Sequence, residues 1–414
     1  MTAAVSEHKQ RLGPEVFDLP VPEIRIGYRS AVYFSRAKRI LEAEKPDTVA
    51  TIQIFQKGNA VLCGIDEALA ILRVGTGSWT DPVKASEWFD RYLEARQDAR
   101  RFRATDPVAA ANARARQVDL EGELDLLWVP AFDDLEVHAL FDGDPIEPWE
   151  TVAHITGPYH LFAHLESVYL GVLARRTKVA TNVAAVVAAA NGKPLLFFAD
   201  RFDHFATQGG DGYAAHVAGA HGVATDAMAA WWGERGLGTM PHGLIAAFEG
   251  DTVATTDAFA RHVPEADLIA LVDFNNDCVG DSVACARRFG DRLWGVRLDT
   301  AETMVDRSIT ADLMGDFNPT GVNVGLVRLV RAALDTEGYS HVRIIVSGGF
   351  DEGRVAEFER AGAPVDAYAV GSALLRGRAD YTADVVMIDG RPLAKAGRKV
   401  RPNSRLELVV DPVS

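Results

Sequence analysis

The chain has 414 residues, which is long enough for two domains. Its 43 basic and 58 acidic residues leave a net charge of −15, which argues against nucleic acid as the main partner. A hydrophobic content of 48% and a charged content of 24% are typical of a globular enzyme and exclude a disordered chain. An anionic substrate would need a locally basic pocket, because the overall field repels it.

The cysteine count and the hydropathy narrow the class of protein further. The three cysteines, Cys63, Cys278 and Cys285, are too few for a disulfide framework or a four-cysteine zinc knuckle, so we expect no zinc. No apolar run approaches the length of a membrane span. The first residues are polar and lack the apolar centre of a signal peptide. We therefore expect a cytoplasmic protein with no membrane partner.

The first part of the chain mixes helical and strand-like patterns. Apolar spacing predicts helices over residues 28–41 and 65–73, and β-rich alternation predicts a strand over 48–55. The segment 81–117 is charged, rich in Arg and Ala, and predicted to be helical. Short strands with turns follow over 126–144. We expect an α/β domain over residues 1–157.

After residue 158 the pattern changes to strands that alternate with helices. A long helical pattern comes first, over 161–190, and ends at Asn191 and Gly192. Seven apolar, strand-like runs then recur, at 195–199, 217–223, 243–247, 268–272, 293–298, 342–346 and 367–370. Such alternation predicts a parallel β/α architecture, and seven runs suit an irregular barrel over residues 158–378. Its active site should gather at the carboxyl ends of the strands.

Two small-residue turns follow neighbouring strands of this expected barrel. Ser347, Gly348 and Gly349 come after one β-branched run, and Gly371 and Ser372 come one β/α unit later. Backbone N–H groups in such turns converge on an anion without side-chain bulk. The alternative is that the glycines only allow tight turns. Because the two turns are one unit apart, we expect them to hold one phosphate between them.

A charged pair and a histidine mark two further strand ends. Arg297 and Asp299 are two apart on a strand and would face the same side, although they could equally form a structural ion pair. Arg297 could bind a carboxylate or phosphate through two donors. Asp299 could accept hydrogen bonds from hydroxyls or help to hold magnesium.

His242 ends the string Gly-Thr-Met-Pro-His, which includes Thr239. A lone histidine is more often a surface or core residue than a catalytic one.

The strongest compact cluster of basic residues in this acidic chain lies within the expected long helix. Arg175, Arg176 and Lys178 form a compact cluster suited to pyrophosphate, or else stabilise a helix C-terminus. Arg201 follows the run at 195–199, and His204 lies three residues later.

Together these motifs resemble the nicotinate phosphoribosyltransferase family, and the resemblance runs along nearly the whole chain. It implies that the two glycine turns bind the 5-phosphate of phosphoribosyl pyrophosphate and that the Arg297–Asp299 strand contacts ribose and nicotinate. It also implies that ATP phosphorylates His242, giving a phosphohistidine that couples ATP hydrolysis to transfer. The tail 379–414, which is β-rich, is implied to pack with the N-terminal part as one discontinuous domain.

The resemblance assigns roles to the remaining candidate residues. Tyr33 would stack on the pyridine ring, supplied by a neighbouring subunit, so a homodimer or higher homo-oligomer is implied. Substrate contacts are implied for Arg175, Arg201 and Thr239. Asp273 and Asp277 match the family pattern and are expected to bind Mg²⁺ or, equally well, to form salt bridges. The chain departs from the family pattern at Ala31, Phe202 and Cys278, where the family usually has aspartate, arginine and glutamate.

The expected reaction joins nicotinate to phosphoribosyl pyrophosphate, giving nicotinate mononucleotide and pyrophosphate, with ATP as co-substrate. Nicotinate is favoured over nicotinamide because an ungapped alignment places Ala215 where the related nicotinamide enzymes have a strand aspartate. Quinolinate enzymes are shorter and carry a basic signature that is absent here. The alternatives are transfer to another base, such as nicotinamide, and a catalytically silent homologue that binds phosphoribosyl ligands.

Overall fold

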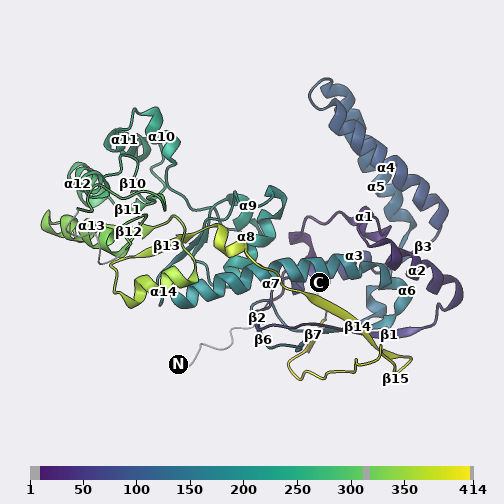
Figure 1. Cartoon of the computed structure of the whole chain (residues 1–414). Helices are drawn as coiled ribbons and strands as arrows, with labels where there is room; N and C mark the ends of the chain where they lie inside the picture. Colours follow the sequence, from purple (N-terminus) through teal and green to yellow (C-terminus); the bar gives the residue numbers. More distant parts are fainter. Residues whose placement is uncertain (1–9, 311–317, 411–414) are drawn as a thin grey trace. The chain divides into compact units, whose positions relative to one another are not determined.

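The computed structural model describes residues 10–310 and 318–410, and Figure 1 shows their helices and strands. The chain divides into two compact units, one formed by Met1–Thr177 with Arg378–Ser414 and the other by Lys178–Gly377. The first break lies inside helix α7 (Glu166–Ala189), whereas the sequence placed it at residues 157/158. The difference arises because the first turns of this helix pack into the core of the first unit.

The first unit is built on an antiparallel sheet whose strands come from both ends of the chain. Its strand order is β15-β14-β1-β7-β5-β16. The strands are β1 (Val49–Gln56), β5 (Glu136–Ala139), β7 (Thr151–Pro158), β14 (Tyr381–Ile388), β15 (Arg391–Pro392) and β16 (Glu407–Leu408). The central strand β1 is antiparallel to both of its neighbours, so Ile52 lies opposite both Val385 and Ile155. The C-terminal tail therefore completes the N-terminal sheet, as expected.

Helices α3 and α7 share the main core of this unit with the sheet. Residues from β1, from α3 (Ile65–Gly75), from β7 and from the start of α7 form one buried apolar cluster, which includes Ile52, Leu69, Ile155 and Leu173. Three shorter helices also belong to this unit: α1 (Val21–Arg25), α2 (Val32–Glu44) and α6 (Tyr159–Phe162). Two small strand pairs complete its β-structure: β2 (Ala60–Val61) with β6 (Pro145–Ile146), and β3 (Gly77–Trp79) with β4 (Trp128–Pro130).

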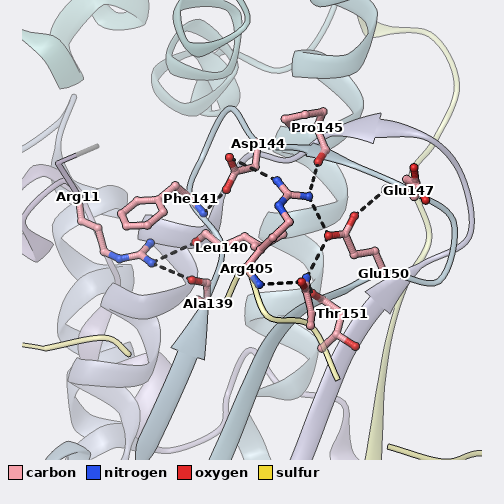
Figure 2. Close-up of polar contacts among 11 residues, drawn as sticks. Arg11, Ala139, Leu140, Phe141, Asp144, Pro145, Glu147, Glu150, Thr151 and Arg405 are labelled. Carbon is pink, nitrogen blue, oxygen red and sulfur yellow. Dashed lines mark hydrogen bonds and ion pairs between the residues drawn. The ribbon is translucent and has the colours of Figure 1, made fainter. Parts of the chain in front are cut away.

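Arginine side chains fasten both chain ends to this sheet (Figure 2). Arg405 donates to the Glu150 carboxylate at 2.8 Å and to the Pro145 carbonyl at 3.0 Å, and its second nitrogen lies 3.6 Å from Asp144. At the other end, Arg11 donates to the Ala139 and Leu140 carbonyl oxygens at 3.3 and 3.1 Å. These contacts use backbone carbonyls near strand ends and so hold segments far apart in the sequence together.

Two long helices form a hairpin within the same unit (Figure 1). They are α4 (Pro82–Phe102) and α5 (Pro107–Leu127). Each begins with an Asp-Pro pair: the side chains of Asp81 and Asp106 accept from the backbone N–H groups of Lys84 and Ala109, at 3.0 and 2.9 Å. An aspartate N-cap followed by proline at the first helical position is a strong helix start. The helical prediction for 81–117 is confirmed, and the structure divides it into two helices.

The second unit contains an open parallel sheet of six strands, which is half of a barrel. Its order is β10-β11-β12-β13-β8-β9. The strands are β8 (Leu195–Phe197), β9 (Gly222–Val223), β10 (Ile269–Leu271), β11 (Gly295–Leu298), β12 (Arg343–Val346) and β13 (Ala367–Val370). Its helices are α8 (Gln208–Val217), α9 (Asp226–Ala229), α10 (His242–Ala247), α11 (Thr252–His262), α12 (Cys278–Phe289), α13 (Val324–Thr336) and α14 (Glu352–Arg360). The predicted fold class is confirmed: the chain has a parallel β/α unit and a discontinuous α/β unit.

Of the seven predicted strands, one is wrong and a second is only partly right. Residues 243–247 form most of helix α10, and the run 217–223 contains the end of α8 and only the two-residue strand β9. Both runs are rich in Ala and Gly and poor in β-branched residues, so apolar character alone did not separate a strand from a buried helix turn. The structure therefore reduces the seven predicted strands to six.

Candidate active site

The second unit contains a pocket of about 640 Å³ at the carboxyl ends of its strands. Segments that follow β8, β11, β12 and β13 line it, together with the loop that precedes α10. Parallel strands bring their carboxyl ends to one edge of a sheet, which is where β/α proteins place their sites. A volume of this size suits a small-molecule ligand.

Ten of the candidate residues line this one pocket. They are Arg201, Thr239, His242, Arg297, Asp299, Ser347, Gly348, Gly349, Gly371 and Ser372. They are far apart in the sequence and come from five segments. The further lining residues are mostly apolar and include Phe198, Phe202, Leu237, Met240 and Phe350.

The first glycine turn, at Gly348 and Gly349, has a backbone conformation that favours glycine. Gly348 and Gly349 have φ angles of 86° and 69°, the left-handed region that favours glycine. A Cβ atom on Gly349 would lie 1.6 Å from the Glu302 carboxylate. Arg354, which the sequence analysis missed, supports this turn by donating to the Gly348 and Gly349 carbonyl oxygens at 3.1 and 3.4 Å. With the carbonyls turned towards Arg354, the amides of the turn are the groups left for a ligand.

The second glycine turn is tight for a different reason. A Cβ atom on Gly371 would lie 2.5 Å from the ring of Phe202 and 2.8 Å from the Phe198 carbonyl oxygen. Gly371 follows β13 directly, and Ser372 begins a short 3-10 helix, Ser372–Leu375. The absence of a side chain at Gly371 therefore lets the Phe202 ring approach the backbone at the pocket wall.

Arg297 is a half-buried cation with a buried donor that has no hydrogen-bond partner among the described residues. Its Nη2 donates to the Met240 carbonyl oxygen at 3.4 Å, while its Nε is buried with no hydrogen-bond partner among the described residues. Burial lowers the pKa of Arg297, and the nearby carboxylates of Asp299 and Asp273 oppose that shift. A buried donor without a partner calls for an explanation, and a bound anion would supply one.

Asp299 is tied to the first glycine turn. The hydroxyl of Ser347 donates to Asp299 Oδ1 at 2.8 Å and to the Leu298 carbonyl oxygen at 3.2 Å. This contact joins the ends of β11 and β12, which pair in register up to Leu298 and Val346. The carboxylate is thereby fixed beside the turn, with acceptor capacity remaining for a hydroxyl of a ligand.

His242 is the first residue of α10, and it is oriented by a carboxylate. Its Nε2 lies 2.9 and 3.0 Å from the two oxygens of Asp273, while 42% of the His242 side chain is exposed. Burial raises the pKa of Asp273, and the His242 contact opposes that rise. When Nε2 donates to the carboxylate, Nδ1 is the nitrogen with a free lone pair. The sequence analysis placed Asp273 with magnesium and missed this pairing, for which the sequence carries no local signal.

The other candidate residues lie elsewhere. Asp277 caps α12 by accepting from the Gly280 N–H at 3.0 Å. Tyr33 belongs to α2 of the first unit, where its ring packs on Phe34 with centroids 4.3 Å apart and its side chain is 64% exposed. Arg175 lies on the part of α7 that belongs to the first unit. None of these three residues is among those that line the pocket.

The structure also corrects the argument from Ala215. This residue is buried in helix α8, not on a strand, and it does not line the pocket. The ungapped alignment therefore compared positions that are not equivalent, and Ala215 says nothing about the base. His204, the second histidine considered, caps a short 3-10 helix by accepting from the Ala206 N–H at 3.2 Å, and its ring stacks on Phe205.

Comparison with known proteins gives a consistent family. No protein-family model matches the chain. The curated nicotinate phosphoribosyltransferase pncB2 of Mycobacterium tuberculosis is 31% identical over 244 residues, which cover 58% of this chain and 48% of that protein. The pncB1 protein of the same organism is 29% identical over 283 residues, which cover 66% of this chain and 58% of that protein. These matches make the chain similar to nicotinate phosphoribosyltransferases over about six tenths of its length.

Solved structures match a larger part of the chain. The nicotinate-nucleotide pyrophosphorylase from Pyrococcus furiosus is 26% identical, with a TM-score of 0.69, over 96% of this chain and 87% of that one. Human nicotinic acid phosphoribosyltransferase has a TM-score of 0.61 over 89% of this chain and 77% of that one, and its 18% identity supports the fold alone. The chain spans about half the length of the pncB2 protein that it matches.

Proposed function

We propose that the chain transfers the phosphoribosyl group of phosphoribosyl pyrophosphate to nicotinate, giving nicotinate mononucleotide and pyrophosphate. The observation that carries the proposal is one pocket that combines two glycine turns with Arg297, whose buried Nε has no partner among the described residues. The names of the relatives, nicotinate phosphoribosyltransferase and nicotinate-nucleotide pyrophosphorylase, both concern the formation or cleavage of a nicotinate nucleotide. NAD biosynthesis is the route in which such a product would be used.

In this proposal the ends of the pocket hold different parts of the substrates. The amides of the turns at Gly348–Gly349 and Gly371–Ser372 hold the 5-phosphate, because anions bind where backbone N–H groups converge. Asp299, fixed by Ser347, accepts from ribose hydroxyls. Thr239 and Arg201 complete the polar wall, and the hydroxyl of Thr239 is buried with no partner among the described residues.

The base is assigned to nicotinate on charge. Arg297 offers a planar fork of donors in a largely apolar site, where its attraction for a carboxylate is strong. A neutral carboxamide would leave the same cation buried and unpaired, at a cost of several kcal/mol. This reason replaces the one based on Ala215.

The chemistry is a displacement at the anomeric carbon. The nicotinate ring nitrogen forms the new C–N bond as the C–O bond to pyrophosphate breaks, and the carbon passes through an oxocarbenium-like state. The pocket contributes by holding the two reactants in line and by balancing the charge of the leaving group. Arg175, on the long helix of the first unit, and Tyr33 remain proposed substrate contacts from outside this pocket, with Tyr33 supplied by a second copy of the chain.

ATP coupling through His242 is part of the proposal. The Nδ1 lone pair attacks the γ-phosphorus of ATP, a P–N bond forms, and ADP leaves as the P–O bond breaks. Asp273 keeps Nε2 protonated and stabilises the positive charge that develops on the ring, as in other carboxylate–histidine pairs. The support is the pair of contacts at 2.9 and 3.0 Å.

Magnesium is the cofactor expected for a pyrophosphate substrate, but Asp273 and Asp277 do not fit as its paired ligands. The Asp273 oxygens face His242, and the Asp277 oxygens face the Gly280 N–H and Arg307. Within residues 10–310 and 318–410, no group of three or more His, Cys, Asp or Glu side chains could hold a metal ion. A bound magnesium ion would neutralise charge on the pyrophosphate.

Turnover with defined bases tests the proposal. The protein is incubated with phosphoribosyl pyrophosphate and, separately, nicotinate, nicotinamide or quinolinate, and mononucleotide and pyrophosphate are quantified by mass spectrometry. We expect equimolar mononucleotide and pyrophosphate with nicotinate and much slower reaction with the other two bases. Preference for another base would overturn the substrate assignment. Saturable binding of phosphoribosyl pyrophosphate by calorimetry without any turnover would instead identify a silent homologue.

A further inference from the structure

The outward face of helix α5 carries an apolar stripe that nothing in the proposed reaction uses. Val108, Ala111, Ala115, Val118 and Gly122 recur at alternating spacings of three and four, which places them in one row along the helix. All five are exposed; the exposed fractions of Val108 and Val118 are 70% and 66%. A Cβ atom on Gly122 would meet nothing within 4 Å. Leu126, which is 80% exposed, extends the row beside its last turn.

This stripe is additional to the face that α5 uses inside its own unit. The buried residues of α5 are Ala110, Ala113, Leu120 and Leu124, on the opposite side of the helix. Leu120 and Leu124 share a small core with Ala85, Phe89 and Tyr92 of α4. Helix α5 therefore has two apolar faces, whereas an ordinary surface helix has one.

Helix α4 provides an internal comparison. It has the same length of 21 residues and runs beside α5 in the same hairpin (Figure 1). Its exposed positions are mostly charged or polar: Lys84, Ser86, Glu87, Asp90, Arg91, Glu94, Gln97, Arg100 and Arg101. The apolar stripe is thus a property of α5 and not of the hairpin in general. Contiguous exposed apolar surface on a soluble chain commonly marks an interaction site.

The charges that flank the stripe are arranged asymmetrically along α5. Arg114 and Arg116 lie in its first half, and the second half carries Asp119, Glu121, Glu123 and Asp125. Arg116 already pairs with Asp98 of α4 at 3.0 Å, and Asp125 pairs with Arg25, so the charge pairing with a partner depends on Arg114 and the remaining carboxylates. A second α5 that runs antiparallel brings Arg114 of each helix towards the acidic half of the other, twice, by symmetry. A parallel helix would set Glu121 against its own copy, which like-charge repulsion disfavours. Antiparallel packing also opposes the two helix dipoles.

We propose that the α5 stripe is the contact surface for a second copy of this chain, with the two α5 helices antiparallel. In this register Ala111 faces Gly122 of the second copy, and Ala115 faces Val118 of the second copy. The two-fold axis passes near Arg116 and Gln117, so the contact is isologous and closed. Small side chains in the row allow the helix axes to approach to the near end of the usual 8–10 Å range.

The size of the contact sets its expected strength. A helix of 21 residues is about 31 Å long, so one helix pair buries less than the roughly 800 Å² per partner of a standard interface. We therefore expect a reversible association that depends on protein concentration. It does not depend on the proposed reaction and can add to any other contact between copies.

Sedimentation velocity of the full chain over a range of concentrations tests the surface. Val118→Glu places a charge in the middle of the stripe. It should weaken one association step, so that the protein concentration at which half of the chains are associated rises at least tenfold. The matched control is Val83→Glu, which makes the same change at a valine that is 72% exposed at the start of α4. Equal sedimentation of wild type and both variants at every concentration would overturn the proposal. Circular dichroism establishes that both variants are folded.

Disulfide trapping tests the antiparallel register. Ala111→Cys and Gly122→Cys are made as two separate proteins and mixed under mild oxidation; the three native cysteines are buried. We expect crosslinks between the two variants in the mixture and not within either variant alone. Crosslinking of Ala111→Cys with itself would overturn the antiparallel arrangement, because only parallel helices place residue 111 beside its own copy. No crosslink in any sample would overturn the contact itself.

Discussion

His242 directs its Nε2 at the carboxylate of Asp273, with distances of 2.9 and 3.0 Å to the two oxygens. The two residues are 31 positions apart and follow different segments of the second unit: His242 starts α10, and Asp273 follows β10. The pair links a side chain that is 42% exposed to one that is only 7% exposed. The buried carboxylate therefore orients the exposed imidazole.

His242→Ala should abolish phosphorylation of the protein by ATP. With γ-labelled ATP we expect label that is lost at low pH and kept in base, as for a phosphohistidine, and no label in the variant. Some ATP-independent transfer should remain, because the glycine turns and Arg297 are untouched. His204→Ala serves as the control, since that side chain caps a short helix away from the pocket lining. Label that persists in His242→Ala would rule out the role.

Asp273→Asn should slow labelling of His242 while leaving substrate binding nearly unchanged. The amide keeps the shape of the carboxylate but cannot hold Nε2–H with a full negative charge, so Nδ1 is a weaker nucleophile. We expect a loss of roughly tenfold or more in the labelling rate, typical of a lost orienting partner. Rapid-quench labelling measures the rate, and the KM for phosphoribosyl pyrophosphate reports binding. A labelling rate equal to that of wild type would show that Asp273 is only a structural neighbour.

Arg297→Lys should weaken nicotinate binding, because a planar fork of donors becomes a single ammonium group. The expected loss is about 1–3 kcal/mol, the range for hydrogen bonds to charged groups. Calorimetry with nicotinate and with nicotinamide measures it, and the loss should be larger for the carboxylate. Unchanged nicotinate affinity in a folded Arg297→Ala variant would contradict the assignment.

Gly349→Val should raise the KM for phosphoribosyl pyrophosphate. The new side chain meets the Glu302 carboxylate and forces the turn out of its left-handed conformation at φ 69°. The control is Gly338→Val, where φ is 83° and a Cβ meets nothing within 4 Å, so it imposes backbone strain without the clash. Steady-state kinetics of the two variants separates the effects. An equal rise in both variants would point to general destabilisation.

Glu166→Gln should stabilise the protein increasingly as pH rises from about 5 to 8. Burial, with a smaller contribution from Asp384, raises the pKa of Glu166 to about 7 in the folded chain, from an ordinary value of 4.5. Between these values the folded state keeps a proton that the unfolded state has released, so the contribution of Glu166 to stability falls as pH rises through 7. Glutamine has no such proton. The difference in Tm between variant and wild type should grow over this range, and Glu94→Gln on α4 is the control.

The sequence determined the elements whose signals are local. Helix starts are marked by the Asp-Pro pairs at residues 81–82 and 106–107. The aspartate cap and the fixed φ of proline both act within the first turn of the helix. The glycines at 348, 349 and 371 likewise mark positions where a Cβ is not tolerated, and their place after apolar runs located the pocket edge. Parallel strands necessarily align their carboxyl ends, so residues far apart in sequence could be assigned to one site.

Only the tertiary structure decided which side chains meet. The sequence carries no local signal that Asp273 orients His242, because the two residues are 31 positions apart and their contact crosses between β/α units. Arg354 lies only six positions after Gly348, but nothing in the pattern marks that its side chain turns back to the glycine turn. The apolar run at 243–247 became the helix α10 because packing, and not propensity, selects between strand and helix in a short run. The ungapped alignment placed Ala215 on a strand, whereas it lies in helix α8. Local rules act over a few residues, whereas contacts between units depend on how whole elements pack, and that information is spread over the entire chain.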